Sequence, residues 1–347
     1  MAQHAQRQAA HLQLLRHRRH PDHAADRTDV NPSDTLGLDA GIEGTHQLTA
    51  SPPKQILGWD SPTTWWLGAG WAEGTVRTPP VNVTLGARYD ASTVYEDAVS
   101  PRLVLARAWR RWHYKAGASR AFRAPGVAAA SPWVVPEKTT AFDGELGVGP
   151  TAWSYLTLSA FDNQLFDPMV YHYEYDPETH EEFEGYRNGD PLHTAGGDAT
   201  LQILSGEVQA SLGVGTTAVV GSAPPDWAVP GAPSRTLSMP QWKAVARGSW
   251  TPTERWHFGG VVTWMGDRWT VSAQDADGNA VYDTVPASVV LDLSAEVHHV
   301  FVRGLSLSAN VHDLLDSAPP LVQPYTGFHL PMPTAGRDVM FRVTVER

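Results

Sequence analysis

The sequence predicts an all-β protein. The expected architecture is an antiparallel up-and-down transmembrane β-barrel, and the chain is expected to form a partial barrel with about 14 strands. Three observations lead to this prediction. Apolar and polar residues alternate with a period of two, short and long connections alternate between the strands, and tryptophans recur at a spacing close to the thickness of a membrane. No comparable helical stripe of apolar residues appears.

The strands follow from residues that alternate between an apolar and a polar face. In the segment 81–90, Val83, Leu85 and Tyr89 lie on the apolar face, whereas Arg88 and Asp90 lie on the other. The same pattern recurs from about residue 35 to the end of the chain. It predicts strands at about 35–45, 63–77, 81–90, 100–109, 112–119, 139–149, 153–162, 194–204, 207–221, 237–251, 255–266, 286–301, 304–315 and 336–346.

The connections between these strands alternate in length. Very short turns fall near Thr78-Pro79-Pro80, Arg110-Arg111, Pro150, Ser205-Gly206, Pro252-Thr253 and Val302-Arg303. Longer loops lie near 91–99, 120–138, 163–193, 222–236, 267–285 and 316–335. This alternation is typical of an up-and-down sheet with one trimmed end and one elaborated end.

Paired tryptophans favour a membrane-spanning sheet over a soluble one. Trp242 and Trp250 lie eight residues apart on one face of a strand, and Trp256 and Trp264 do the same on the next strand. Eight residues of a tilted strand rise roughly 20 Å along the membrane normal, which approaches the roughly 25 Å height of the apolar band of outer-membrane barrels. Indole rings favour the membrane interface, so these four residues are expected to form an interface girdle.

Charged residues occupy the opposite face at mid-strand positions, among them Arg88, Lys115, Lys243, Asp292 and Arg342. These charges would be costly in hydrocarbon, and a barrel turns them toward a polar interior. An open sheet with a solvated outer face, as in a soluble β-sandwich, would also accommodate them.

Composition excludes several other classes of protein. Acidic residues outnumber basic ones 37 to 26, for a net charge of −11, which argues against nucleic-acid binding. The chain has no cysteine, so disulfides, thiolate metal sites and Cys nucleophiles are excluded. No metal site is predicted, because the adjacent residues His298 and His299 would point to opposite faces of a strand. No nucleophile elbow, HExxH helix or phosphate-cradling loop stands out, so we expect no enzyme and no cofactor.

The N-terminal segment differs from the rest of the chain. Residues 1–30 hold five of the 15 histidines and no Phe, Trp or Tyr, and they do not match the pattern of a signal peptide. We expect residues 1–34 to be disordered or poorly formed and residues 35–347 to form the barrel.

Short motifs occur in a characteristic order over roughly residues 64–346. They are Gly70–Arg77, Val83–Asp90, Ser100-Pro101-Arg102-Leu103, Ser119–Pro125, Pro136–Thr139, Glu145-Leu146-Gly147, Leu158–Asn163, Trp264–Trp269, Leu305–Asp316 and Gly336-Arg337. Together they resemble the C-terminal barrel of TonB-dependent outer-membrane receptors. The strand-end motif Ser119-Arg120-Ala121-Phe122-Arg123-Ala124-Pro125 is the most specific match.

The resemblance implies a place in the cell outer membrane, in contact with its lipid. It also implies uptake of a scarce small-molecule or metal-chelate ligand, such as an iron-siderophore, haem or cobalamin, driven by the TonB energy-transducing complex. The family's plug domain and TonB-engaging box are not visible, and its barrels have 22 strands, so we expect a truncated receptor. The alternatives are a soluble Trp-rich β-sandwich that binds carbohydrate, and a non-functional remnant of a receptor.

The longest loop carries the candidate ligand contacts, which are Tyr171, His172, Tyr173, Glu174 and Tyr175. Their aromatic surfaces, together with an imidazole and a carboxylate, would suit an aromatic siderophore or a haem. A loop that packs on itself would use the same residues.

Overall fold

The computed structural model describes residues 23–48, 55–56, 59–60, 64–125, 134–175, 182–276, 279–324 and 330–346. The described residues form strands, turns and loops but no helix, and accordingly none of them lies in a helix able to cross a membrane.

The large sheet contains fifteen strands. They are β1 (His23–Ser33), β2 (Leu36–Leu48), β5 (Thr64–Arg77), β6 (Asn82–Ser92), β7 (Ala98–Ala108), β8 (Trp112–Arg123), β9 (Glu137–Val148), β10 (Ser154–Phe166), β13 (Leu192–Ser205), β14 (Val208–Val219), β15 (Trp242–Thr253), β16 (Trp256–Met265), β19 (Ser288–Val297), β20 (Leu305–His312) and β21 (Asp338–Val345). The remaining strands form three two-stranded hairpins: β3 (Gln55–Ile56) with β4 (Trp59–Asp60), β11 (Met169–Tyr175) with β12 (Glu182–Asn188), and β17 (Arg268–Gln274) with β18 (Ala280–Val285).

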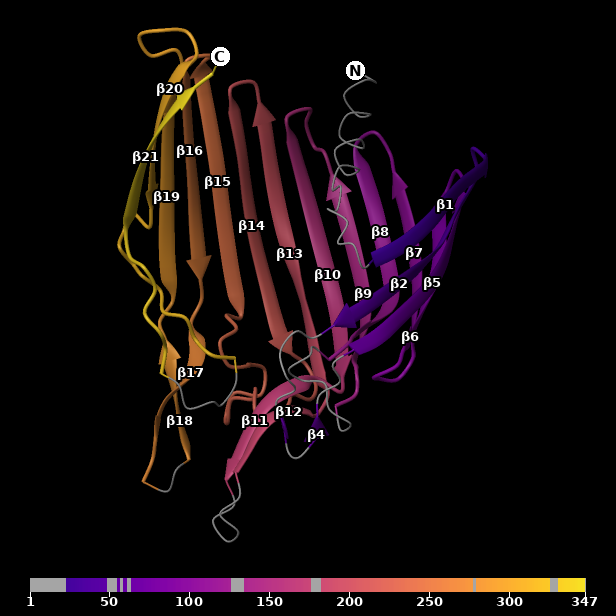
Figure 1. The fold of residues 1–347 in the computed structure, drawn as a ribbon. Coiled ribbons are helices and arrows are strands. Elements are labelled where there is room, and N and C mark those ends of the chain that lie inside the picture. The colour runs from indigo at the N-terminus through magenta and orange to yellow at the C-terminus, as the bar shows by residue number, and fades with distance from the viewer. Residues whose placement is uncertain are drawn as a thin grey trace.

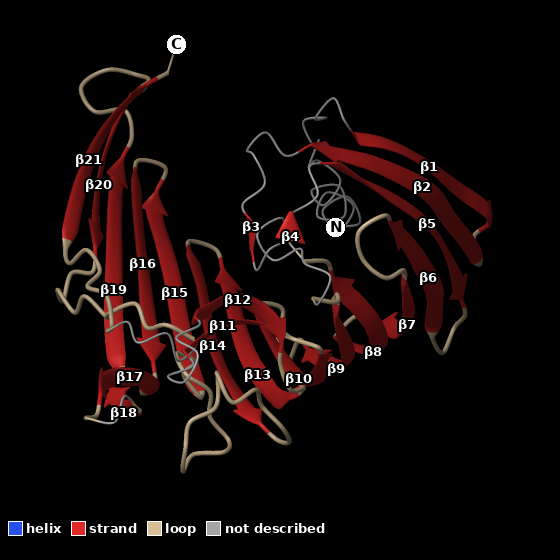
Figure 2. Ribbon diagram, turned by 60° about the horizontal axis from the view of Figure 1, so that its bottom comes forward, coloured by secondary structure: helices blue, strands red, loops and turns tan. Residues whose placement is uncertain are grey.

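Each strand of the large sheet pairs antiparallel with the next strand of that sheet along the chain. The predicted up-and-down order is therefore confirmed, and all fourteen predicted strands are present. The sheet is strongly curved, and its two edge strands, β1 and β21, lie on opposite sides of it and do not pair with each other (Figures 1 and 2). The described part of the chain thus forms an open, curved wall.

Strand β1 differs from the expected disorder of residues 1–34. It pairs with β2 from His23↔Thr45 to Val30↔Leu38, and the amide of Leu36 donates to Ser33 Oγ at 3.1 Å in the turn between them. An edge strand of this kind is held by backbone hydrogen bonds and needs no apolar stripe, which is why the alternation pattern missed it. Residues 1–22 lie outside the described residues.

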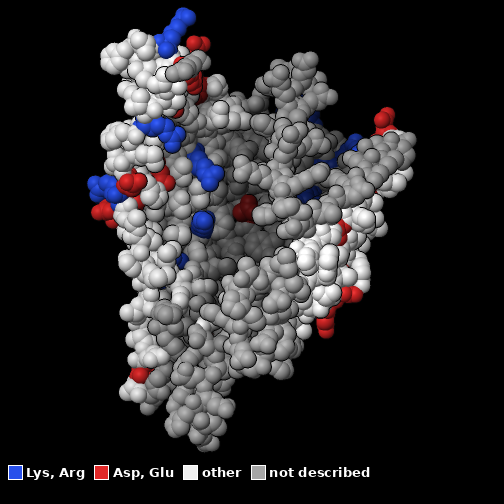
Figure 3. Space-filling model, viewed as in Figure 1, with Lys and Arg blue, Asp and Glu red and all other residues white. Residues whose placement is uncertain are grey.

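The two faces of the sheet differ as the alternation predicts. Cross-strand partners share a face, and Leu85 with Leu103, like Leu146 with Leu158, form exposed apolar pairs. Lys and Arg side chains line the hollow of the curved sheet in Figure 3. The apolar face is therefore the convex one, and the charges face the enclosed side.

The small hydrophobic core lies outside the large sheet. Val229, Leu237 and Val271 are buried together where the loop after β14 meets the hairpin β17–β18, with Trp269 and Tyr282 packed against them. A soluble β-sandwich would instead bury one face of each of two packed sheets. That alternative is wrong, because the described residues form one large sheet and otherwise only two-stranded hairpins.

Candidate functional site

The long connections gather at one end of the sheet, as the alternation of loop lengths predicts. The hairpins β11–β12 and β17–β18 extend beyond that end, at the bottom of Figure 1. We call it the loop end, and the opposite end, where the turns are tight, the turn end. The sequence predicted these segments as loops without the hairpins, which are too short for periodicity to reveal.

The candidate ligand residues lie on strand β11. Successive strand residues point to opposite faces, so Tyr171 and His172 do not share one surface. The ring of Tyr171 packs edge-on against Tyr186 of β12, with centroids 5.4 Å apart. Tyr173, Glu174 and Tyr175 continue the strand, and their side chains lie outside the described part of the structure.

An aspartate from a neighbouring loop holds the hairpin in place. Asp226 is 9% exposed, and its Oδ1 lies 3.0 Å from His172 Nδ1, while its Oδ2 lies 3.6 Å from Arg187 Nη2. His172 belongs to β11 and Arg187 to β12, so one carboxylate contacts both strands. His172 thus joins two loops, and its role as a ligand contact stays a prediction.

The base of the same hairpin is fixed by Glu137. Its carboxylate pairs with Arg123, at 2.5 Å from Nε and 2.9 Å from Nη2, and accepts the amide of Met169 at 3.1 Å. Asn188 adds hydrogen bonds to both backbone groups of Val135, at 2.8 and 3.0 Å. The end of β8, the start of β9 and the hairpin therefore form one connected unit. The sequence supplied Arg123 and Glu137 as parts of two separate motifs, and nothing in their spacing predicted the pair.

A second set of contacts orders the segment between β20 and β21. Asp313 is 1% exposed and accepts hydrogen bonds from the amide of Ala318 at 2.8 Å and from Ser317 Oγ at 2.7 Å. These hydrogen bonds, the one from Ala318 foremost, lower the pKa of the Asp313 carboxyl. Asp316 accepts the amide of Arg337 at 2.8 Å, so the turn after β20 is tied to the residue that precedes β21.

Arg268 connects this segment to the hairpin β17–β18. Its side chain is almost fully buried, and its Nη2 donates to the carbonyl of Pro320 at 3.0 Å. Burial lowers the pKa of the Arg268 guanidinium. Ser238 Oγ donates to the carbonyl of Val322 at 2.8 Å and brings in the loop that precedes β15. The loops at the loop end therefore contact one another through these hydrogen bonds, and they lie at one end of the curved sheet.

Ion pairs line the inner face of the sheet between β2 and β10. Lys115 pairs with Asp143 at 3.4 Å, and His113 Nε2 lies 2.6 Å from Glu145 Oε1. The hydroxyl of Tyr155 contacts the other ring nitrogen of His113. These pairs give the enclosed side a polar surface in which most charges have opposite neighbours.

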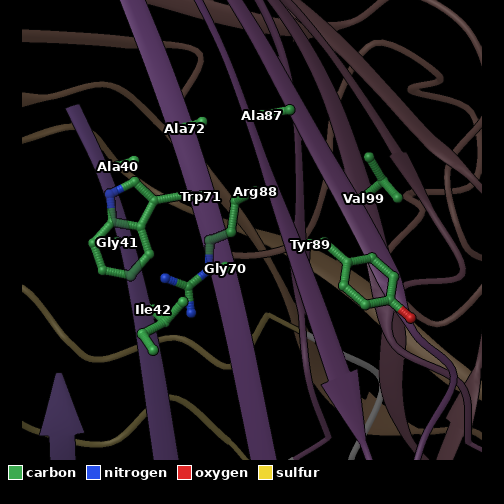
Figure 4. A pocket seen from close by; sticks show the side chains of 10 residues that line it. All are labelled: Ala40, Gly41, Ile42, Gly70, Trp71, Ala72, Ala87, Arg88, Tyr89 and Val99. Atoms are coloured by element: carbon green, nitrogen blue, oxygen red, sulfur yellow. The ribbon is translucent and has the colours of Figure 1, made fainter. Parts of the chain in front are cut away.

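Arg88 and Trp71 form a cation–π pair on this inner surface. Figure 4 shows their side chains side by side, and the guanidinium lies 5.6 Å from the indole centroid. The same guanidinium contacts Asp90 at 2.8 Å and Glu43 at 3.2 Å. Because Arg88 is already paired with two carboxylates, it forms part of the wall and leaves little free charge for a ligand.

The predicted girdle tryptophans lie at the two ends of their strands. Trp242, Trp250 and Trp256 are 48%, 49% and 43% exposed, and Trp264 is half-buried. At the turn end, Trp250 and Trp256 each stack with Phe258, with ring centroids 5.7 and 5.8 Å apart. This placement fits an interface girdle, whose contact with lipid stays a prediction.

The sequence analysis did not single out three further tryptophans at the turn end. They are Trp109, Trp112 and Trp153, and all three are exposed. Their position in the sequence, directly beside the tight turns, could have identified them as further candidates for the interface girdle. A metal site is not evident either: within the described ranges, no group of three or more His, Asp or Glu side chains could hold a metal ion.

Comparison with known proteins places this geometry in context. The family model of the TonB dependent receptor-like β-barrel matches residues 16–314. A mutant of the ferric enterobactin receptor PfeA from Pseudomonas aeruginosa is 18% identical, with a TM-score of 0.70 over 93% of this chain and 53% of that chain. The siderophore receptor PirA from Acinetobacter baumannii is 13% identical, with a TM-score of 0.70 over 93% of this chain and 54% of that one.

A third similar structure is the FrpB iron transporter from Neisseria meningitidis, at 13% identity and a TM-score of 0.68, over 92% of this chain and 54% of that chain. The chain thus spans about half the length of these solved structures. No curated protein matches the sequence. At such identities the structural likeness concerns the fold alone.

Proposed function

The chain belongs to the TonB dependent receptor-like β-barrel family, and we propose that it forms the wall of an outer-membrane receptor that takes up an iron-siderophore complex. The family consists of transport receptors rather than enzymes, which agrees with the expectation from the sequence. Barrels of this family are outer-membrane proteins, and we infer the same location for this chain.

One observation carries the proposal. The curved sheet has an apolar convex face and a charged concave face, and its long loops interlock at one end. A wall of this kind separates lipid from an enclosed polar path. The loop end then supplies the contacts that capture the ligand before it enters the path.

The proposed ligand class is supported by the names of solved structures of similar fold, which include a ferric enterobactin receptor and a siderophore receptor. The aromatic residues Tyr171, Tyr173 and Tyr175 of the hairpin β11–β12 would stack on an aromatic siderophore. The energy for uptake would come from the TonB complex, and the chain spans about half the length of the solved structures of similar fold. Outer-membrane lipid would surround the convex face.

A binding titration tests the proposal. The chain is refolded in detergent, and tryptophan fluorescence is followed during addition of a ferric catecholate, a ferric hydroxamate or haemin. We expect saturable quenching with one of these classes and a weaker response with the iron-free siderophore. The variant Tyr171→Ala should weaken binding, whereas Tyr282→Ala, a loop-end tyrosine in the small core, serves as the control.

The result also separates the alternatives. A chain that migrates as a heat-modifiable folded barrel, yet binds none of the three ligands, would contradict the receptor proposal and favour a receptor remnant.

A further inference from the structure

Three neighbouring turns at the turn end combine arginines with aromatic rings. They join β5 to β6, β7 to β8 and β9 to β10, and the segments 77–82, 107–114 and 148–154 around them contain no Asp or Glu. They hold Arg77, Arg107, Arg110 and Arg111, in a chain whose net charge is −11. This local excess of positive charge therefore runs against the overall composition.

The aromatic rings of the β7–β8 turn face the apolar side of the sheet. Tyr114 is the cross-strand partner of Arg107 and of Leu146, and Leu146 lies on the exposed convex face. Trp109 and Trp112 stack on each other with ring centroids 3.8 Å apart. Both rings are exposed, at 39% and 42%. A stacked pair of indoles on this face lies where a barrel meets the headgroup layer.

Arg107 adds a guanidinium to the same stack. It lies 5.9 Å from the centroid of the Trp109 ring, and its Nη1 donates to the carbonyl of Thr78 at 2.8 Å. Its Nε is buried and has no hydrogen-bond partner among the described residues. Because the Nε group is buried, any ligand contact of this arginine would use its terminal Nη1 and Nη2 groups.

The turn itself is held rigidly from both sides. The carbonyl of Arg111 accepts the amide of Gly149 from the next turn at 2.6 Å, while Arg107 reaches the preceding turn at Thr78. Arg110 and Arg111 are exposed, and neither has an ion-pair partner in the part of the chain that the structure describes. Two free guanidinium groups are therefore presented from a fixed backbone beside an aromatic surface.

We propose that this turn cluster, consisting of Arg107, Trp109, Arg110, Arg111, Trp112 and Tyr114, binds the phosphate headgroup of an anionic phospholipid. Guanidinium groups bind phosphate oxygens through paired N–H donors, and indole rings occupy the adjacent interface. The inference rests on the membrane location within the proposed function and is independent of the ligand that the receptor takes up.

Native mass spectrometry of the full chain tests the site. The protein is held in detergent micelles that contain phosphatidylglycerol or phosphatidylcholine with the same acyl chains, and the lipid adducts are compared. We expect the wild type to retain phosphatidylglycerol in preference to phosphatidylcholine. The double variant Arg110→Gln/Arg111→Gln should lose phosphatidylglycerol affinity by roughly 30-fold, since each basic residue near an anionic surface contributes about fivefold.

The matched control is Arg255→Gln/Arg303→Gln, which removes the same charge from two other turns at the same end. It should keep the preference, and both variants should show heat-modifiable migration as a check of folding. Equal retention of the two lipids by the wild type, or an equal loss in the control variant, would overturn the proposal. Displacement of phosphatidylglycerol by millimolar inorganic phosphate would also overturn it, because the site would then bind a soluble anion.

Discussion

Arg123, the last residue of β8, and Glu137, the first residue of β9, form a two-point ion pair, with Arg123 Nε 2.5 Å from one carboxylate oxygen and Nη2 2.9 Å from the other. The Arg123 side chain is 65% exposed, whereas the Glu137 side chain is 10% exposed. The same carboxylate accepts the amide of Met169, the first residue of β11. One acidic residue thus couples the barrel wall to the hairpin that carries the candidate ligand residues.

Replacing Glu137 with Gln should loosen that hairpin without unfolding the sheet. The amide side chain cannot keep both charge-assisted bonds, each of which contributes about 1.5–3 kcal/mol before screening by solvent at the exposed Arg123. We expect faster hydrogen exchange at the amide of Met169. The control is Glu96→Gln, whose 3.6 Å contact with Lys138 is largely exposed and should matter little. Unchanged exchange at Met169 in Glu137→Gln would contradict the coupling.

The contact between His172 and Asp226 should protect the hairpin β11–β12 from proteases. In Asp226→Ala the hairpin loses the contacts that His172 and Arg187 make with this carboxylate, so we expect limited proteolysis to cut between β11 and β12 several times faster. Asp267→Ala is the matched control, because it removes a half-exposed loop carboxylate whose ion-pair partner among the described residues is Arg235. If both variants were cut at the wild-type rate, Asp226 would not hold the hairpin.

Asp313 should make the segment between β20 and β21 sensitive to acid. Because hydrogen bonds lower the pKa of this carboxyl in the folded protein, its stabilising effect is present above the pKa of the unfolded chain and is lost as the pH falls through the folded value. Hydrogen exchange at the amide of Ala318 should therefore gain protection as the pH rises through the acid range, after correction for intrinsic exchange.

The variant Asp313→Asn has no charge to lose, so its protection should be weaker and flat over the same pH range. A variant with the wild-type pH profile would show that another group is responsible.

The close packing of His113 and Tyr155 on the inner face should tolerate only glycine at position 147. A Cβ atom at this position would collide with the His113 ring and the Tyr155 hydroxyl, whereas a Cβ at Gly144 on the same strand meets nothing within 4 Å. We expect Gly147→Ala to destabilise the protein by about 1–3 kcal/mol in a urea titration of the refolded chain, with Gly144→Ala close to wild type. Equal midpoints for the two variants would contradict the close packing of His113.

The strands of the large sheet were predictable because each must present one apolar and one polar face, and residues such as Leu85 and Arg88 record that alternation directly. Strand β1 was not predictable in this way, because residues 23–30 show no regular alternation of apolar and polar residues, although their backbones pair with β2. The orientation of the apolar face also followed from the sequence, through the charges that oppose it.

The arrangement of the loops could not be predicted from local pattern. His172 meets Asp226 across 54 residues, and Arg268 meets Pro320 across 52. Such contacts depend on which loops the curvature of the sheet brings together, and a period-two pattern holds no information about that curvature. The five candidate ligand residues were found by their composition, and the structure adds that they lie on a strand, so that the neighbours Tyr171 and His172 face opposite sides of it.

We propose that the convex face of the sheet meets lipid while the concave face meets water. The chain has no cysteine, so single cysteines can be placed at Leu146 and Leu158 on the convex face and at Thr157 and Ser159 on the other, and spin-labelled after reconstitution into liposomes. We predict that Leu146→Cys and Leu158→Cys are relaxed mainly by membrane-soluble oxygen, and Thr157→Cys and Ser159→Cys mainly by a water-soluble nickel chelate. Similar accessibility at all four positions, or the reverse assignment, would contradict the account.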